Sequence, residues 1–397
     1  MKKQCHAIPP QTVRPAGALS GCTGHVKNAA VQRMCWLIWR DCFKLVQRLL
    51  HRCTLCGAGA CRRVVRLCWL LAAGQAFAAQ APDCAAVTPV PWRAVVPGVW
   101  SWLPERASES APENKGHVLP TTVVVDAGEA MVIDPGPHFA HGQRVRASLA
   151  CHFGARPRWV VNTHAHAKNV LGNAAFADLQ ATGQVQIMAS AGTRQAMQHR
   201  CPQCLQSLTE MLGDEAMRQT HIVLPDRLLV ADEVLAVGRL RLQVLLADNA
   251  HTESDVLLWL PAPRLLLAGG LVYEGRLPEL AQGSVNGWLK ALQRLMALHP
   301  QIVVGDAVSI APGPQSLPPA IEATNHYLQG LRARLLAAMN QGQHGSETQT
   351  LSWPEHAHWV DFEERQDLNV QRAWRELESE WMSDALPAAG SVPDIGR

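Results

Sequence analysis

The sequence predicts an α+β protein of the αββα type, in which two β-sheets pack face to face and helices cover their outer faces. Two observations predict this fold. Strand-like segments come in two groups, at residues 121–188 and 240–267, and helix-like segments follow each group. The chain has 397 residues, of which 48% are hydrophobic and 17% charged, a composition that can form a sizeable core.

The first group of strands consists of β-branched or apolar runs separated by turn residues. Residues 121–125 are β-branched, Asp126-Ala127-Gly128 predicts a hairpin turn, and residues 131–133 return as a strand. Residues 159–162 and 185–188 are further short strands. Helices are expected at residues 143–151, 168–176 and 192–212.

The second group leads into a helical C-terminal part. Strands are expected at residues 240–246, 255–260, 265–267 and 302–304, and a helix at 288–298. Residues 312–319 have the composition of a linker, and residues 320–382 are largely helical in pattern. We therefore expect the sandwich to occupy residues 92–315 and a C-terminal helical extension to occupy residues 316–385.

The N-terminal part of the chain has the features of an export segment. Residues 1–60 are expected to form a basic, Cys-rich extension, and residues 61–78 a signal peptide. An Arg pair precedes an apolar run that ends in Ala76-Phe77-Ala78, the small-x-small pattern that signal peptidase recognises. The run is shorter than the about 20 residues of a membrane span; a buried helix is the alternative. We expect a periplasmic protein that contacts the membrane only through this segment.

Charge and cysteine content divide the chain at the same place. Residues 1–70 contain 12 Lys and Arg and one acid, whereas the remainder contains 24 bases and 32 acids. The mildly acidic remainder lacks the basic footprint of a nucleic-acid-binding protein, so no nucleic-acid partner is expected. Eight of the 12 cysteines lie at or before Cys68, and the even number that remains suits an oxidising compartment.

The four later cysteines include a C-x-x-C pair, Cys201 and Cys204. This pair is expected to form a structural disulfide, or to bond to Cys84 or Cys151, rather than to act as a redox-active dithiol.

Two histidines separated by one residue stand where a predicted strand ends. Residues 162–173 read NTHAHAKNVLGN, which places His164 and His166 on the loop before a helix. An extended backbone sends side chains i and i+2 to the same side, so both rings can bind one ion at about 2.0–2.1 Å. Such a pair alone is more often a polar loop. His251 stands at another strand boundary, in the sequence AHTESD (250–255), and this third ring favours a metal site.

These segments resemble the motifs of the metallo-β-lactamase superfamily and occur in its order. NTHAHAKNVLGN is similar to the family signature NTHxHxDHxxGN. The other motifs are VIDPG (132–136), HTESD (251–255), LLAGGLV (266–272) and VVGD (303–306). The resemblance extends over about residues 95–310 and implies the metallo-β-lactamase fold.

A narrower resemblance is to exported zinc metallohydrolases of quinoprotein-relay and sulfur-oxidation systems. It is carried by CPQCL (201–205), NVQR (369–372) and ELE (376–378). It implies a periplasmic redox-system partner.

Carried over residue by residue, the resemblance implies one intact zinc site and one replaced site. The ligands of the first site correspond to His164, His166 and His251. The positions of the second site hold Lys168, Asn169, Gly270 and Asp306. Lys168 is expected either to pair with Asp306, in the space of the second zinc, or to point to solvent. Lys168 and Asp306 are the candidate catalytic residues, and one Zn²⁺ ion is expected.

Three neutral histidines and one open position are typical of catalytic zinc. The implied function is hydrolysis of an ester, thioester or amide, in an unknown small-molecule substrate, by zinc-bound hydroxide. However, Lys168 replaces the family's Asp, which positions the water and takes its proton, so whether the chain is an enzyme stays open. The alternative is a catalytically inactive periplasmic binding or accessory protein of a quinoprotein or sulfur-oxidation system. A true β-lactamase is a third candidate.

Other residues near the motifs are expected to support the site. Asp134 resembles a buried family Asp that orients the histidines, and Thr252 and Asp255 are expected to hold the His251 loop. The charged stretch 105–115 is either a flap or a solvated loop. Four histidines without a partner pattern are expected at the surface: His141, His152, His199 and His221.

Overall fold

The computed structural model describes residues 83–105, 110–345 and 351–385 of the chain. The described residues belong to one compact unit. The predicted basic extension (1–60) and signal peptide (61–78) lie outside the described residues, as do residues 106–109 of the expected flap or solvated loop. In the described part of the chain, no helix is both long and apolar enough to cross a bilayer.

The first sheet has seven strands in the order β1-β2-β3-β4-β5-β6-β7. Neighbouring strands are antiparallel from β1 to β4 and parallel from β4 to β7. The strands are β1 (Arg93–Val96), β2 (Val99–Trp102), β3 (Thr121–Asp126), β4 (Glu129–Ile133), β5 (Arg156–Val161), β6 (Gln186–Ala189) and β7 (Arg227–Leu228). The predicted hairpin turn joins β3 to β4 through Ala127 and Gly128, both with positive φ.

The second sheet has six strands in the order β13-β12-β11-β10-β9-β8. They are β8 (Val234–Val237), β9 (Leu240–Asp248), β10 (Ser254–Leu260), β11 (Leu265–Leu267), β12 (Ile302–Val304) and β13 (Val308–Ile310). Only the β11–β12 pair is parallel among the pairs described for this sheet. Every residue of β10 is buried, which is expected of a central strand covered on both faces.

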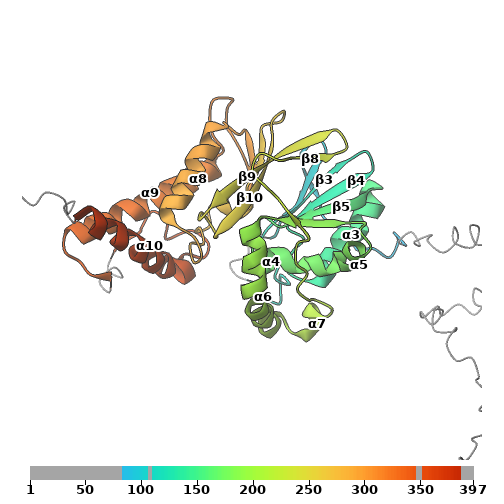
Figure 1. Cartoon of the computed structure of the whole chain (residues 1–397), viewed down its shortest axis with the longest axis horizontal. Helices are drawn as coiled ribbons and strands as arrows, with labels where there is room; N and C mark the ends of the chain where they lie inside the picture. The colour runs from blue at the N-terminus through green and yellow to red at the C-terminus, as the bar shows by residue number, and fades with distance from the viewer. Residues whose placement is uncertain (1–82, 106–109, 346–350, 386–397) are drawn as a thin grey trace, which may run out of the picture. The chain divides into compact units, whose positions relative to one another are not determined.

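Helices cover the outer faces of both sheets, so the layers run helix, sheet, sheet, helix (Figure 1). On the first sheet lie α3 (Phe139–Phe153), α4 (Ala167–Val170), η2 (Leu171–Phe176), α5 (Ala177–Ala181), α6 (Ala191–Leu212) and α7 (Asp214–Met217). With the second sheet lie η3 (Gly269–Leu271), α8 (Val285–Ala297), α9 (Pro319–Asn340) and α10 (Phe362–Ala385). The predicted αββα fold is confirmed.

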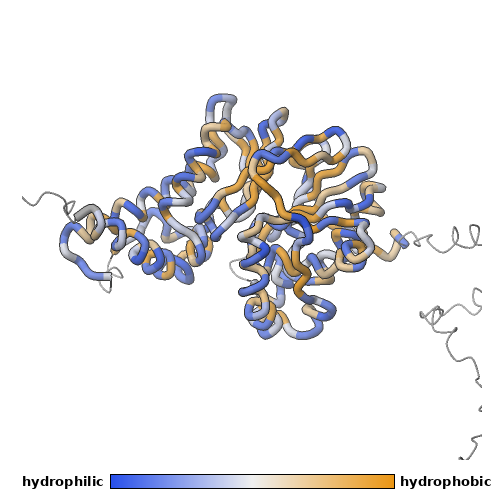
Figure 2. The backbone as a smooth tube through the Cα atoms, in the orientation of Figure 1, coloured by the Kyte–Doolittle hydropathy of each residue, from blue (hydrophilic) through white to orange (hydrophobic). Residues whose placement is uncertain are grey.

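Apolar residues concentrate along the strands at the centre of the domain (Figure 2). The core between the sheets joins β3, β4 and β5 to β8, β9 and β10, and includes Val124, Val161 and Leu258. A second core lies between the second sheet and α8, α9 and α10, with Trp288 fully buried in it. The C-terminal helices are therefore packed into the same unit as the sandwich.

Several elements differ from the sequence-based expectation. The helix predicted at 168–176 is divided into α4 and the 3-10 helix η2. Gly172 of η2 packs closely against the Pro135 carbonyl, where a Cβ would be only 2.2 Å away. The C-terminal helical pattern is not continuous, since α9 ends at Asn340 and α10 begins at Phe362. Five short strands, β1, β2, β7, β8 and β13, were not expected.

Candidate metal centre

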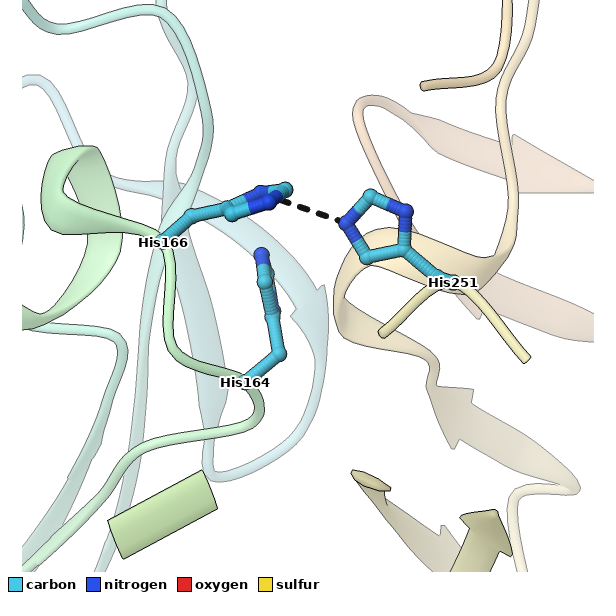
Figure 3. A group of neighbouring side chains, drawn as sticks. All are labelled: His164, His166 and His251. Carbon is cyan, nitrogen blue, oxygen red and sulfur yellow. Dashed lines mark hydrogen bonds between the residues drawn. The ribbon is translucent and has the colours of Figure 1, made fainter. Parts of the chain in front are cut away.

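The three histidines of the sequence motifs come together from the two sheets. His164 and His166 lie on the loop after β5, and His166 is the N-cap residue of α4. His251 lies in the turn between β9 and β10 of the other sheet. Figure 3 shows the three rings turned toward one another.

The rings form a compact, buried cluster. Their centroids are separated by 4.7 Å for His164–His166, 4.8 Å for His164–His251 and 4.7 Å for His166–His251. One nitrogen of each ring lies within 4.8 Å of the others. The residues are 0%, 8% and 1% exposed for His164, His166 and His251. The predicted meeting of three imidazoles, one of them distant in sequence, is confirmed.

The outer nitrogen of His164 is held by hydrogen bonds that lead to a buried carboxylate. His164 Nδ1 lies 2.7 Å from Thr163 Oγ1, and that hydroxyl donates to Asp134 Oδ2 at 2.6 Å. Because the Thr163 hydrogen is directed to Asp134, the hydroxyl accepts from His164 Nδ1. His164 Nε2 is then unprotonated, and it is buried without a hydrogen-bond partner among the described residues.

The segment before α8 orients the other two rings. His251 Nδ1 donates to the backbone oxygen of Glu279 at 2.9 Å. His166 Nε2 donates to Gln282 Oε1, and Glu279 Oε1 lies 3.7 Å from the same nitrogen. The nitrogens left to face the cluster are His251 Nε2 and His166 Nδ1, which lie 3.3 Å apart.

The inner nitrogens of His166 and His251 are spaced like two ligands of one zinc ion, and one nitrogen of His164 lies within 4.8 Å of them. Ligands about 2.0–2.1 Å from a tetrahedral ion lie about 3.3 Å from one another, which agrees with the separation of His251 Nε2 and His166 Nδ1. Burial lowers the pKa of His166 and lowers the pKa of His164 and His251 well below the ordinary value. The rings are therefore neutral at pH 7, as metal ligands must be. Outer nitrogens hydrogen-bonded to hydroxyl, amide and carbonyl oxygens are typical of histidine ligands.

Comparison with known proteins identifies the fold. A family model described as the metallo-beta-lactamase superfamily matches residues 118–307, the part of the chain that contains all three histidines. The domain has the metallo-β-lactamase fold.

Several solved structures are similar to this chain at low sequence identity. The metallo-beta-lactamase FIM-1 of Pseudomonas aeruginosa, solved in a mono-zinc form, is 19% identical, covers 62% of this chain and 96% of its own, and has a TM-score of 0.45. The Pontibacter korlensis metallo-beta-lactamase is 22% identical, with coverages of 61% and 99% and a TM-score of 0.44. The Hirschia baltica enzyme is 17% identical, with coverages of 61% and 98% and a TM-score of 0.45. A search of curated proteins found no match.

Within the metallo-β-lactamase fold, two buried carboxyl groups fix the histidine loops, as predicted. Asp134 accepts hydrogen bonds from Thr163 N at 2.8 Å and Thr163 Oγ1 at 2.6 Å. Burial raises the pKa of Asp134 to about 7, against the lowering effect of these bonds. Asp255 accepts from Thr252 N at 2.9 Å and Thr252 Oγ1 at 2.8 Å, which closes the turn directly after His251.

The predicted pair of Lys168 and Asp306 is wrong. Lys168 Nζ donates to Glu279 Oε2 at 3.3 Å, so it does not simply point to solvent either. Asp306 instead lies 3.7 Å from the guanidinium Nε of the buried Arg276 and accepts from the backbone nitrogen of Glu274 at 2.9 Å. A buried guanidinium requires anionic partners, and the Asp306 carboxylate is one of the partners of Arg276.

The other two positions of the family's second metal site also have structural roles. Asn169 Nδ2 donates to Asp134 Oδ2 at 3.2 Å. Gly270 packs against the His251 ring, because a Cβ at this position would lie 2.2 Å from His251 Cδ2. The site needs a glycine here to leave room for the ring.

Sequence reasoning missed Glu279, the central acidic residue of the site. Besides Lys168, it pairs with Arg365 Nη1 of α10 at 3.2 Å. Burial alone would raise its pKa, but the positive charges of Lys168 and Arg365 contribute to a pKa well below the usual value. Glu279 and Gln282 lie in a segment without helix or strand, so no periodicity or motif indicated them.

The prediction for His141 is wrong, because this ring is buried. It stacks on Trp102 at a centroid distance of 4.1 Å, and its Nε2 forms a hydrogen bond with Thr121 Oγ1 at 3.0 Å. It faces the sheet from the first turn of α3. His152, His199 and His221 are exposed, as expected.

The expected disulfide pairing of the C-x-x-C motif is also wrong. Cys84 is bonded to Cys151, and Cys201 and Cys204 are free thiols on α6. Burial raises the pKa of Cys201 to about 12 and also raises the pKa of Cys204. Cys201 packs in one small core with Met197, Ala165 and Val170. It is therefore a core residue that contacts the loop carrying His164 and His166.

Proposed function

We propose that this chain is a zinc hydrolase with a single metal ion, which cleaves an ester, thioester or amide bond in a small molecule. One observation carries the proposal: three buried rings, each fixed through its outer nitrogen, present their inner nitrogens to one another. His164, His166 and His251 would hold the ion. A zinc ion held by three histidines supplies Lewis-acid activation of water near neutral pH.

The residues at the second metal site support one ion rather than two. Lys168 and Gly270 have no side-chain atom that can bind a cation at neutral pH. Asn169 donates through Nδ2 to Asp134, which leaves only one neutral amide oxygen as a ligand atom at this position, and Asp306 is paired with Arg276. The ammonium of Lys168 supplies a positive charge two residues after the ligand His166, so a second cation next to it would be repelled.

Lys168 is the residue placed to act on a substrate. Its side chain is 19% exposed, and its ammonium lies 3.3 Å from Glu279 Oε2. Such a group can donate a hydrogen bond to the acyl oxygen as negative charge develops on it. Arg365 contacts the same Glu279 oxygen, so the Glu279 charge remains balanced when Lys168 turns toward the substrate.

Metal analysis combined with a hydrolysis panel tests the proposal. We expect about one zinc per purified chain and turnover of at least one of an aryl ester, an acyl thioester and a cephalosporin. His251→Ala is expected to lose both zinc and turnover. His199→Ala is the matched control, because this histidine is exposed on α6, and it is expected to retain both.

The alternative, a binding or accessory protein without catalysis, is distinguished by the same measurements. Zinc at one ion per chain with no turnover of any substrate would favour it over the hydrolase, because the family's water-positioning Asp is replaced by Lys168. Absence of zinc from protein purified without chelator would contradict the proposed metal centre.

We further propose that the protein works in the periplasm, with a partner from a quinoprotein or sulfur-oxidation system. The Cys84–Cys151 disulfide supports an oxidising compartment, and the motifs at 201–205 and 369–378 support the narrower group. Fractionation of cells that express the full chain is expected to recover it in the periplasm, with the Cys84–Cys151 bond formed. Recovery of a reduced protein in the cytoplasm would contradict the localisation.

A further inference from the structure

The segment that orients two of the three histidines has no helical or strand hydrogen bonds to fix its conformation. Residues 277–284 contain no helix or strand, yet they supply the Glu279 carbonyl to His251 and the Gln282 amide oxygen to His166. An irregular segment keeps one conformation only when other elements satisfy its backbone groups. The hydrogen-bond partners of these backbone groups therefore show which elements fix the segment that orients His166 and His251.

Asn369 of α10 satisfies the backbone on both sides of Glu279. Its Oδ1 accepts from Leu280 N at 3.0 Å, and its Nδ2 donates to Pro278 O at 2.7 Å. The same Nδ2 lies 2.8 Å from Tyr327 Oη of α9. Asn369 is 1% exposed, so these bonds are shielded from water and replace contacts that a helix or strand would otherwise provide.

Charged groups of α10 hold the side chain of Glu279 and the start of the segment. Arg365 pairs with Glu279 at 3.2 Å and with Asp361 at 3.1 Å. Asp361, directly before α10, also pairs with Arg276 at 2.6 Å. The segment is thus fixed at its beginning and at Glu279 by residues more than eighty positions later in the chain.

Glu376, further along α10, fixes the end of the segment and, through it, the His251 loop. Its carboxylate accepts from Ser284 Oγ at 2.7 Å, Val285 N at 3.0 Å and Asn286 N at 3.0 Å, which caps the N-terminus of α8. Ser284 N in turn donates to Ala250 O at 3.0 Å, the residue before His251.

We propose that α10 is part of the metal centre, with Asn369 and Glu376 as positioning residues that set its affinity for zinc. Asn369 places the Glu279 carbonyl that orients His251, and Glu376 places the α8 end of the segment that carries Gln282. The C-terminal helix is therefore required for the metal site itself. This inference rests on the proposed zinc function. The Glu279 carbonyl and the Gln282 amide, which these two residues position, are the direct outer partners of His251 and His166, and loss of such partners typically lowers metal affinity by about 10- to 100-fold.

Zinc affinity, measured by competition with a chromophoric chelator, tests the inference in the full chain. Asn369→Leu keeps a branched side chain of four heavy atoms but removes every side-chain hydrogen bond, and we expect its zinc Kd to rise by about 10- to 100-fold. Leu368→Ala, one residue earlier and 55% exposed, is the control and should bind zinc like the wild type. The free energy of unfolding of each apoprotein is measured in parallel, to separate metal affinity from fold stability.

A second pair of variants decides the matter if Asn369→Leu does not fold. Glu376→Ala is expected to weaken zinc binding by about tenfold or more, whereas Glu378→Ala, an exposed neighbour on α10, is expected to leave it unchanged. Glu376→Gln keeps an acceptor oxygen for the α8 cap and is expected to restore part of the affinity. If the wild type binds zinc and the folded Asn369→Leu and Glu376→Ala variants bind it with the same Kd, the inference is overturned but the proposed function is not. A wild type that binds no zinc would overturn the proposed function as well.

Discussion

Gly270→Ala tests the geometry of the metal centre with a single added methyl group. Gly270 lies in η3, and its backbone is outside the left-handed region, so alanine brings no backbone strain. The new Cβ would lie 2.2 Å from Cδ2 and 2.5 Å from Nε2 of His251. Ordinary carbon contacts are about 3.5–4.0 Å, so the ring must move by more than about 1 Å.

That displacement is large for a metal ligand. Ligand distances in zinc sites vary by only about 0.2 Å, so His251 should no longer reach the position shared with His164 and His166. We expect the zinc Kd to rise by at least about 100-fold, or about 2.7 kcal/mol. Crowding in the core should also destabilise the apoprotein, by about 1–3 kcal/mol.

The assay is a zinc competition titration, together with denaturant unfolding of the apoprotein. Gly330→Ala is the matched control, because a Cβ at this position in α9 would meet no atom within 4 Å. It should leave zinc binding unchanged and stabilise the helix by about 0.5–1 kcal/mol. A Gly270→Ala protein whose zinc Kd stays within threefold of the wild type would refute the assignment of His251 as a ligand packed against Gly270.

Three further predictions concern Lys168, the Cys84–Cys151 disulfide and His117. Lys168→Met should keep about one bound zinc but lower kcat by about 100-fold or more, and an unchanged kcat would exclude Lys168 from catalysis. Cys84→Ser removes a disulfide that spans 67 residues, and chemical unfolding should show a loss of about 4 kcal/mol; a loss below about 1 kcal/mol would contradict a structural role for this bond. Burial lowers the pKa of His117 to about 4, so its contribution to stability is complete above pH 6.5 and is lost as the pH falls toward 4. His117→Gln should therefore reduce the acid dependence of unfolding by about 3 kcal/mol over this range, whereas an unchanged pH profile would show that His117 is protonated equally in both states.

The fold and the three histidines could be predicted because their signals are local. His164 and His166 follow the short strand β5, whose last two residues are buried, at a spacing that puts both rings on one side of an extended chain. His251 stands directly before the apolar run of β10, at the same kind of boundary. Strand alternation, turn residues and motif order were sufficient to bring these segments to one edge of a two-sheet sandwich.

The surroundings of the histidines could not be predicted because they depend on contacts between distant segments. Glu279 lies in an irregular segment whose place is fixed by α10, and the partner of Lys168 could be found only once that segment was in place. Asp306 was paired with Lys168 because both correspond to positions of the family's second metal site, whereas its contact with the buried Arg276 has no signal in the sequence. The environment of His141 on α3 likewise depends on Trp102, which contacts it from strand β2.

Zinc stoichiometry measured by elemental analysis on the purified full chain, in the wild type and in His251→Ala, is the most direct test of the metal centre. Three neutral histidine rings face one another, and Lys168 and Gly270 stand at positions of the second metal site. We therefore expect about one zinc per chain in the wild type and a large loss of bound zinc in His251→Ala. Two zinc ions per chain, or one ion that His251→Ala retains with unchanged affinity, would contradict a single ion held by these three histidines.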